Sequence, residues 1–484
     1  MKAHSSLLLA ALFAGFALSA NAGQSLEQIR YALYKDPNAD VLADLRALAE
    51  RGDLASKQLL GERLAAGDSA NAEQSLALYK EAFAGGRGEV PALASMARLL
   101  DANPRLRKAN AEYVRDALGR YPHERDPRTL DATLEVFVVF PEYFDNARVQ
   151  RLIELYEASC LEFCRPQFFR AVLAERQGQR ELAERLYRKS VRVDTRAVVR
   201  YYEFLGDRQD TEFPAFARSL QGQMGSLPVE TVQRIATLLD SIYSTRNGLA
   251  AIENRAAREA DAGLDGDEKD AAKQAEEARA KAQQQVEARQ NAEVRAWLDN
   301  AVGRNWVPAM VSKVNNMTSW PTDFTADQAL ALVDRVAASD PQQGKALRVS
   351  VLMVTNWLTL DPEKAHGLIE ELLADHYRDA NLLLGDLYSR GGLDEADQDK
   401  ALAIFKEQAR LGAPSAFYRI ASIYYIGRSI CHDKVQAHAY AEASMGLGEF
   451  RARGLLKRLE KDMTADELAR AAVVRDQIIK EYRL

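Results

Sequence analysis

The last third of the chain repeats with a fixed step of 36 residues. Alanines recur at this step in two series: Ala380, Ala416 and Ala452, and Ala365, Ala401 and Ala437. A period of about 34 to 40 residues with small residues at fixed offsets is typical of stacked helix-turn-helix units. The small residues mark the places where two helices of such a unit cross closely. The sequence therefore predicts an all-α solenoid over this part of the chain.

Local signals for helix ends accompany the repeat. Asp361-Pro362 has the residue types of an N-cap followed by the first helical position, and the segment from Thr464 to Glu467 matches a capping box. Gly391 and Gly412 stand where helices are expected to end, since glycine adopts the left-handed backbone conformation at little cost. The helix boundaries are thus predicted independently of the period.

Weaker copies of the pattern occur earlier. Residues 57–97 show the same small and aromatic positions, and residues 167–190 are closer to a 34-residue spacing. The run Leu134 to Phe140 (LEVFVVF) fits the repeat poorly and has the composition of a strand. Within a helical array we expect it to form a buried helix.

The first 22 residues differ in kind from the rest. Lys2 precedes an apolar run, and Ala20-Asn21-Ala22 forms a small-residue cleavage site. This is the pattern of a cleaved secretory signal peptide. We expect a mature chain that begins near Gly23 and lies in the periplasm or outside the cell, and no later apolar run is long enough to predict a transmembrane segment.

Three cysteines leave two interpretations open. Cys160 and Cys164 are spaced for a disulfide at the end of a helix, which an oxidising compartment would favour. Alternatively, both are small buried apolar residues. Cys431 is left over in either case.

A charged, alanine-rich segment separates two parts of the chain. From Arg255 to Asn291 the large aliphatic residues are Leu264 and Val286 alone, so a helix here has little to bury. It lacks the apolar seam of a coiled coil, and we expect a solvated helical spacer that begins after the break at 263–266. The predicted organisation is a signal peptide (1–22), an N-terminal helical repeat region (23–250), the spacer (251–298) and C-terminal repeats (299–484).

Motifs for chemistry are absent from the sequence. It has no H-E-x-x-H, no C-x-x-C pair, no G-x-S-x-G and no phosphate-binding glycine loop. Cys431, His432 and His438 match no common metal-ligand spacing, and incidental polar residues of a loop explain them better. Carboxylate pairs such as Glu370-Glu371 are expected on solvated helix faces. We therefore predict a non-catalytic binding protein that needs no cofactor.

Three motifs give the C-terminal part a resemblance to a known family. They are the A-x4-G-x2-Y spacing of Ala380, Gly385 and Tyr388, the Lys400-Ala401 pair, and the terminal L-x2-L-x3-M-T-x-x-E motif. In these features the segment from Ala380 to Leu468 resembles Sel1-like repeats, a variant of the tetratricopeptide repeat. The resemblance implies a right-handed superhelical solenoid of tetratricopeptide/Sel1-like helix-turn-helix repeats.

The layout of the whole chain is similar to the AlgK-type scaffolds of bacterial alginate biosynthesis. That resemblance implies a periplasmic scaffold for polymerisation and export of polymannuronate, which bridges an inner-membrane synthase and an outer-membrane porin. AlgK-type proteins generally carry a lipidated cysteine at the cleavage site, whereas this chain has Ala22-Gly23-Gln24. A lipid anchor is therefore not predicted, although peripheral association with the outer membrane is compatible with the resemblance.

Protein partners are favoured over direct binding of polymer. The formal charge is −6, and loss of residues 1–22 removes one lysine and no acid, which gives −7. Such a chain repels nucleic acid and polyuronate alike. Tyr425 and Arg428 are the candidate partner-binding residues, since Tyr388 and Tyr424 occupy core positions of the repeat. A generic periplasmic adaptor and a polysaccharide-modifying enzyme are the alternative functions.

Overall fold

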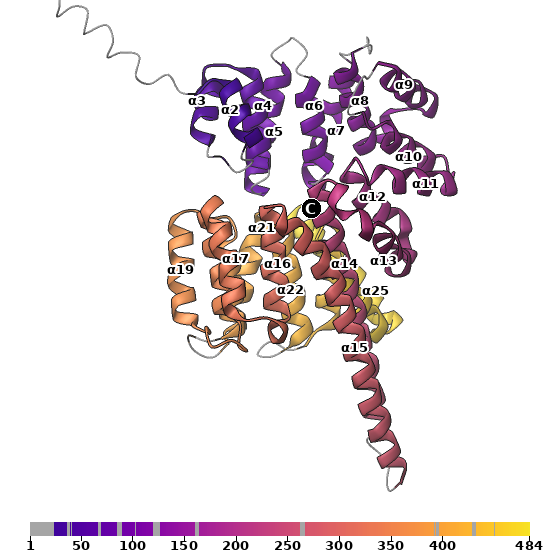
Figure 1. Cartoon of the computed structure of the whole chain (residues 1–484), viewed down its shortest axis with the longest axis vertical. Helices are drawn as coiled ribbons and strands as arrows, with labels where there is room; N and C mark the ends of the chain where they lie inside the picture. Colours follow the sequence, from indigo (N-terminus) through magenta and orange to yellow (C-terminus); the bar gives the residue numbers. More distant parts are fainter. Residues whose placement is uncertain are drawn as a thin grey trace, which may run out of the picture. The chain divides into compact units, whose positions relative to one another are not determined.

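The regular secondary structure of the described residues is helical (Figure 1). The computed structural model describes residues 24–35, 39, 41–65, 69–84, 90–101, 103–119, 126–159, 164–261, 267–391, 393, 396–427, 432–449 and 451–484. Across these ranges no strand is formed, and most helices pack against their neighbours in the chain. The prediction of an all-α solenoid is confirmed. No described helix is both long enough and apolar enough to cross a bilayer.

The chain forms two compact units, Met1–Met96 and Ala97–Leu484. The helices of the first unit are α2 (Leu26–Lys35), α3 (Leu42–Glu50), α4 (Leu54–Ala65), α5 (Ser69–Ala84) and the first part of α6 (Val90–Asp101). A Cβ atom on Gly61 of α4 would lie 2.6 Å from the ring of Tyr79 on α5. Glycine at this position therefore lets the two helices approach closely.

The second unit continues from the end of α6 into α7 (Pro104–Gly119). The helices that follow have cores rich in aromatic residues, and they are α8 (Pro127–Val139), α9 (Asn146–Ser159), α10 (Pro166–Arg176), α11 (Arg180–Ser190), α12 (Arg196–Leu205) and α13 (Gln209–Leu220). We call α8 to α13 the aromatic block. The apolar run from Leu134 lies in α8 with Phe137 fully buried, so the expected buried helix is confirmed.

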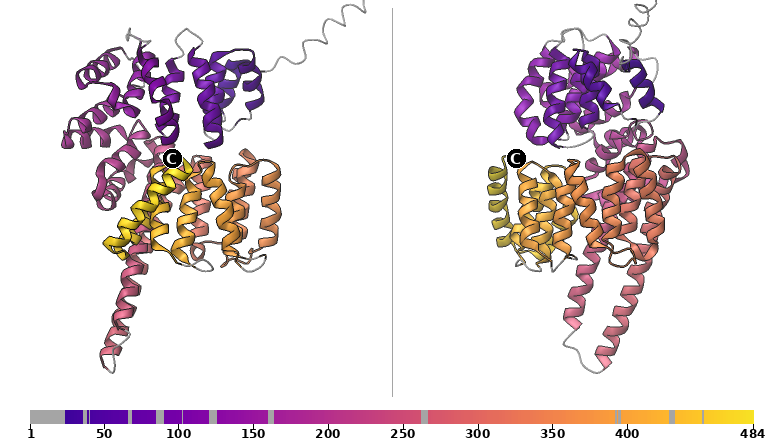
Figure 2. Two further views of the ribbon diagram at one scale, coloured as in Figure 1. Left: turned by 180° about the vertical axis from the view of Figure 1, so that it is seen from behind. Right: turned by 90° about the vertical axis from the view of Figure 1, so that its left-hand side faces the viewer.

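Two long helices follow, α14 (Val229–Asp261) and α15 (Asp267–Gly303). They pair along their length, and the views of Figure 2 show their tip projecting beyond the other helices of this unit. The described side chains of α15 between residues 269 and 289 are exposed or half-buried, as expected for a solvated spacer. The predicted boundaries at 250/251 and 298/299 fall inside α14 and α15, which continue through them.

The C-terminal helices reproduce the 36-residue period. They are α16 (Val307–Ser319), α17 (Ala326–Ser339), α18 (Pro341–Leu352), α19 (Pro362–Ala374), α20 (Ala380–Arg390), α21 (Gln398–Arg410), α22 (Pro414–Ile426), α23 (Lys434–Gly446), α24 (Ala452–Asp462) and α25 (Ala465–Tyr482). Within the predicted repeat region 299–484, the name C-terminal repeats is kept from here on for α20 to α25 alone. All six periodic alanines are fully buried. A Cβ atom on Gly385 would lie 2.4 Å from the ring of Phe405, which explains the glycine at this crossing.

Short 3₁₀ helices connect some of these elements: η1 (Pro141–Tyr143), η2 (Gly206–Arg208), η3 (Gln221–Ser226) and η4 (Pro321–Asp323). The predicted helix ends are also present. Asp361 accepts a hydrogen bond from the amide of Lys364 at 3.0 Å, and Thr464 and Glu467 form a reciprocal capping box. Gly391 and Gly412 have φ values of 78° and 86°, which other residues adopt only with strain.

Helix α24 packs against α14, although the two helices are far apart in the sequence. Gly454 of α24 faces Thr245 of α14 so closely that a Cβ atom would meet the hydroxyl at 2.6 Å. The ammonium group of Lys457 forms an ion pair with Asp210 at 2.6 Å. The second unit is therefore held by contacts between its early and late helices as well as by contacts between neighbours.

Candidate binding pocket

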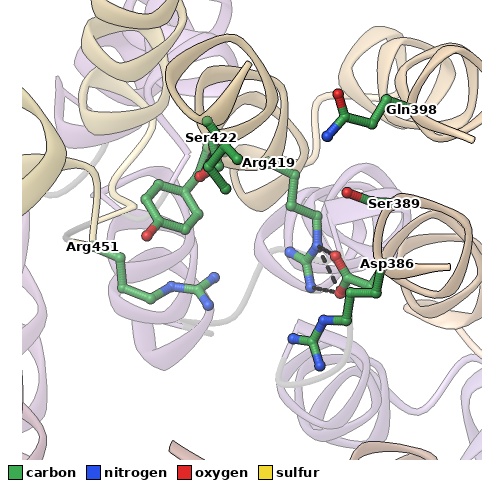
Figure 3. A pocket seen from close by; sticks show the side chains of 9 residues that line it. Asp386, Ser389, Gln398, Arg419, Ser422 and Arg451 are labelled. Atoms are coloured by element: carbon green, nitrogen blue, oxygen red, sulfur yellow. Dashed lines mark hydrogen bonds and ion pairs between the residues drawn. The ribbon is translucent and has the colours of Figure 1, made fainter. Parts of the chain in front are cut away.

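A polar pocket lies between the first helices of two successive C-terminal repeats. It has a volume of about 370 Å³, and α20 and α22 supply most of its walls. Arg451, the residue immediately before α24, supplies a further side chain (Figure 3). Asp386 of α20 and Arg419 of α22 meet at this pocket, so it spans the first helices of two successive repeats.

One ion pair forms the floor of this pocket. Arg419 of α22 donates to both carboxylate oxygens of Asp386 of α20, with N···O distances of 2.8 to 3.0 Å (Figure 3). The side chains are 20% and 32% exposed. A bidentate ion pair of this kind fixes the plane of the guanidinium group. Arg419 is thus held in one orientation across the two repeats.

A second ion pair holds Arg451. Its Nε and Nη2 atoms donate to the two carboxylate oxygens of Glu449 at 2.9 and 2.7 Å, and the guanidinium lies 5.1 Å from the centre of the Tyr418 ring. Hydrogen bonds to Glu449 raise the pKa of Arg451. Burial acts to raise the pKa of Glu449, but hydrogen bonds and the charge of Arg451 outweigh it and lower that pKa. Both groups are therefore charged at neutral pH.

The third arginine of the pocket, Arg390, is exposed at the end of α20 and forms no ion pair with any described residue. The carboxylates of Asp386 and Glu449 neutralise the other two arginines. The described part of the site therefore carries a surplus of one positive charge. Ser389 and Ser422 add hydroxyl groups to the wall. Such a set of donors can bind an anionic group.

Tyr425 lies outside this pocket. Its side chain is half-buried against the apolar core, Arg458 lies 5.7 Å from the centre of its ring, and Nδ1 of His432 is 2.7 Å from its carbonyl oxygen. Arg428 lies outside the described residues. The assignment of these two residues to a partner-binding surface stays a prediction. Tyr388 and Tyr424 pack against the core, where the repeat pattern places them.

The arginines of the pocket were not singled out from the sequence. Asp386 and Arg419 are 33 residues apart, close to one repeat step, which places them on neighbouring first helices. A search for opposite charges one repeat apart would have found this pair. Arg390 and Arg451 carry no comparable signal, because both stand at helix ends whose direction depends on packing.

The structure describes one of the two cysteines of the predicted disulfide. Cys164 is disulfide-bonded, and the other two cysteines of the chain, Cys160 and Cys431, lie outside the described residues. The pairing with Cys160 stays a prediction. Cys164 directly precedes Arg165, which belongs to the charged cluster of the aromatic block.

That cluster surrounds Glu135, whose side chain is 1% exposed. Its carboxylate forms an ion pair with Arg196, and Arg165 and Arg98 approach within 3.7 and 3.8 Å. Arg196 also pairs with Asp194 at 2.8 Å. Burial raises the pKa of Glu135, although Arg196, Arg98 and Arg165 act to lower it. Since the carboxylate is enclosed by arginines and shielded from solvent, it is suited to holding helices together.

The described histidines do not form a metal site. Within the ranges that the structure describes, no three His, Cys, Asp or Glu side chains are grouped closely enough to hold a metal ion. His438 is buried between Glu442 and Glu460, with N···O distances of 3.6 and 3.7 Å, whereas His432 contacts the carbonyl of Tyr425. Cys431 lies outside the described residues.

No family model matches this chain. A comparison with curated proteins also finds no match. Among solved structures, the chain is similar to a protective antigen of uropathogenic Escherichia coli displaying an SLR fold, with 16% identity over 91% of this chain and 95% of that chain, and a TM-score of 0.24. It is also similar to a Sel1 repeat protein from Oxalobacter formigenes, with 16% identity over 86% and 90% of the two chains and the same TM-score. Likeness at this level bears on neither ligand nor partner.

Proposed function

We propose that this protein is a non-catalytic scaffold that binds other proteins through the first helices of its C-terminal repeats, α20, α22 and α24. The observation that carries this proposal is the polar pocket built across successive repeats, with arginine side chains held in place by Asp386 and Glu449. Stacked repeats expose extended surfaces of this kind, and a few arginine or aromatic anchors supply much of the affinity at protein interfaces.

A more specific role follows from the sequence. We place this scaffold in the periplasm, in a complex that polymerises and exports an exopolysaccharide, with alginate as the polymer. Its partners there are an inner-membrane synthase and an outer-membrane porin. The support is the signal-like segment 1–22 and the motif resemblance of the segment from Ala380 to Leu468. A generic periplasmic adaptor for cell-envelope proteins is the alternative that shares every repeat feature.

The specific role is tested by the polymer that a deletion strain secretes. We expect loss of high-mass uronic-acid polymer and release of short uronate oligomers, both reversed by the complementing gene. Unchanged polymer in the deletion strain would reject the alginate role and leave the adaptor.

Binding through the first helices is tested by site-specific photocrosslinking in cells. A photoreactive residue in place of Ser389, in the pocket, is expected to form adducts with the synthase or the porin. The matched control is Glu407 on the second helix α21, whose side chain is 61% exposed. Equal adducts from both positions, or none from Ser389, would reject this face as the binding surface.

A further inference from the structure

We infer that the pocket between α20 and α22 binds one carboxylate group of an acidic side chain from a partner protein. The inference rests on the proposed scaffold function and names the chemistry that the pocket recognises. It is carried by a difference in pairing among the three arginines of the pocket. Arg419 and Arg451 each form an ion pair within the protein, whereas Arg390 has no ion-pair partner among the described residues.

Two of the arginines are fixed in the same way. In Arg419 and in Arg451 the Nε and Nη2 atoms face an internal carboxylate, Asp386 and Glu449 respectively. A guanidinium group has five N–H donors, so the Nη1 edge of each remains for another acceptor. For Arg419 this edge has one long contact within the protein, 3.4 Å to the carbonyl oxygen of Ser415. The internal acids therefore orient donors without exhausting them.

Arg390 supplies the net attraction. Its side chain is exposed beside the pocket and has no ion-pair partner among the described residues. Arg419 and Arg451 are neutralised and act as oriented hydrogen-bond donors, whereas Arg390 contributes an uncompensated charge. A charge-assisted hydrogen bond to such a group is about twice as strong as a neutral one. One carboxylate satisfies both requirements.

The same charge balance disfavours a polyanion. A polyuronate presents a carboxylate on every sugar, so binding it by charge requires a row of unpaired cations. On α24, two of the basic residues are already neutralised, since Lys457 pairs with Asp210 and Lys461 pairs with Glu253. The net charge of −6 repels a polyanion more strongly than a single acidic side chain. A protein ligand is therefore favoured over the polymer.

The experiment uses the full chain with 15N-labelled arginine, and follows the Nε–H signals by NMR. The probes are a capped tripeptide with a central glutamate, the same tripeptide with glutamine, and a mannuronate trisaccharide. We expect saturable shifts of the pocket arginines with the glutamate peptide alone. Arg390→Gln is expected to weaken this binding about tenfold or more. Arg410→Gln, at an exposed ion-paired arginine on α21, is the matched control and should leave it unchanged.

Three results would overturn the inference: equal binding of the glutamine peptide, equal effects of the two substitutions, or Arg390-dependent binding of the trisaccharide alone. Unchanged melting temperatures would show that both variants fold. The secreted-polymer experiment tests the export role separately from the pocket inference. If the glutamate peptide binds while the deletion strain makes normal polymer, the export role alone is wrong. If polymer is lost but no probe binds, the pocket inference alone is wrong.

Discussion

The C-terminal repeats and the aromatic block contain the same kind of helix hairpin and stabilise it differently. In the C-terminal repeats, helices cross at alanine and glycine, with Ala401 and Ala437 fully buried and Gly385 against Phe405. In the aromatic block, rings fill the space between the helices, as where Tyr201 lies edge-on to Phe216 at 4.8 Å. Small residues at a fixed spacing make the repeat recognisable in the sequence. Aromatic rings can fill the space between two helices from many different positions, so a hairpin packed in this way shows no regular spacing in the sequence.

Both regions have a mixed set of helix ends. In the C-terminal repeats, α21, α23 and α25 each have a side-chain N-cap, from Asp397, Asp433 and Thr464, whereas α20, α22 and α24 have none. In the aromatic block, Asp126 caps α8, whereas α10 to α13 begin without a side-chain cap hydrogen bond. Local caps therefore fix only some of the helices in each region. The aromatic block depends in addition on the charged cluster around Glu135.

The largest expected effect tests that dependence. Glu135→Ala removes the buried carboxylate on which Arg196, Arg165 and Arg98 converge, and breaking a buried ion pair costs about 3 to 5 kcal/mol of unfolding free energy. Because Asp194 still pairs with Arg196, we expect a loss at the lower end of that range. Denaturant titration of the full chain measures it. The control is Glu157→Ala, in the same block, where the ion pair with Arg170 is about half exposed and worth under about 1 kcal/mol. Similar losses of unfolding free energy in both variants would mean that the buried cluster stabilises the fold no more than an exposed ion pair does.

The close crossings of the C-terminal repeats give the next effect. Gly385→Ala forces Phe405 to move, and overpacking of this kind costs about 1 to 3 kcal/mol. Gly446→Ala is the control, because an added Cβ there meets nothing within 4 Å and a change under about 0.5 kcal/mol is expected. Equal stability of the two variants would show that the crossing is looser than the structure indicates.

Local capping is tested at α25. Thr464→Ala removes the hydroxyl that accepts from the amide of Glu467, and the expected loss is about 1 kcal/mol. Thr464→Ser keeps the oxygen and should retain most of the stability in the same thermal or chemical unfolding assay. A loss of the same size in Thr464→Ser would assign the effect to the methyl group instead of the cap.

The smallest effect depends on pH. The pKa of Glu449 is lowered in the folded protein, so its ion pair with Arg451 stabilises the fold above the unfolded pKa and is lost as pH falls through the folded value. Glu449→Gln is expected to cost under about 1 kcal/mol at pH 7, since Arg451 is 56% exposed. The difference from wild type should shrink as the pH falls below the usual glutamate pKa of 4.5. A constant difference across this range would mean that the charge contributes nothing.

Much of the fold could be predicted because its signals are local. The period predicted the buried alanines, Asp361 and Thr464 predicted two helix starts, and the break at 263–266 predicted the start of α15 at Asp267. The pocket could be predicted only in part. Asp386 and Arg419 lie about one repeat apart and so on neighbouring helices, but the approach of Arg451 depends on the turn between α23 and α24.

By itself, the sequence determined where helices form, where they end and which small residues lie at their crossings. These properties depend on side chains a few residues apart and on one repeat step. Only the tertiary structure decided that α24 packs against α14, that Lys457 meets Asp210, and that Glu135 is enclosed by arginines. The reason is physical, because these contacts join helices that are far apart in the chain. Which residues meet depends on the lengths and packing angles of all the helices between them, and no local sequence pattern specifies that sum.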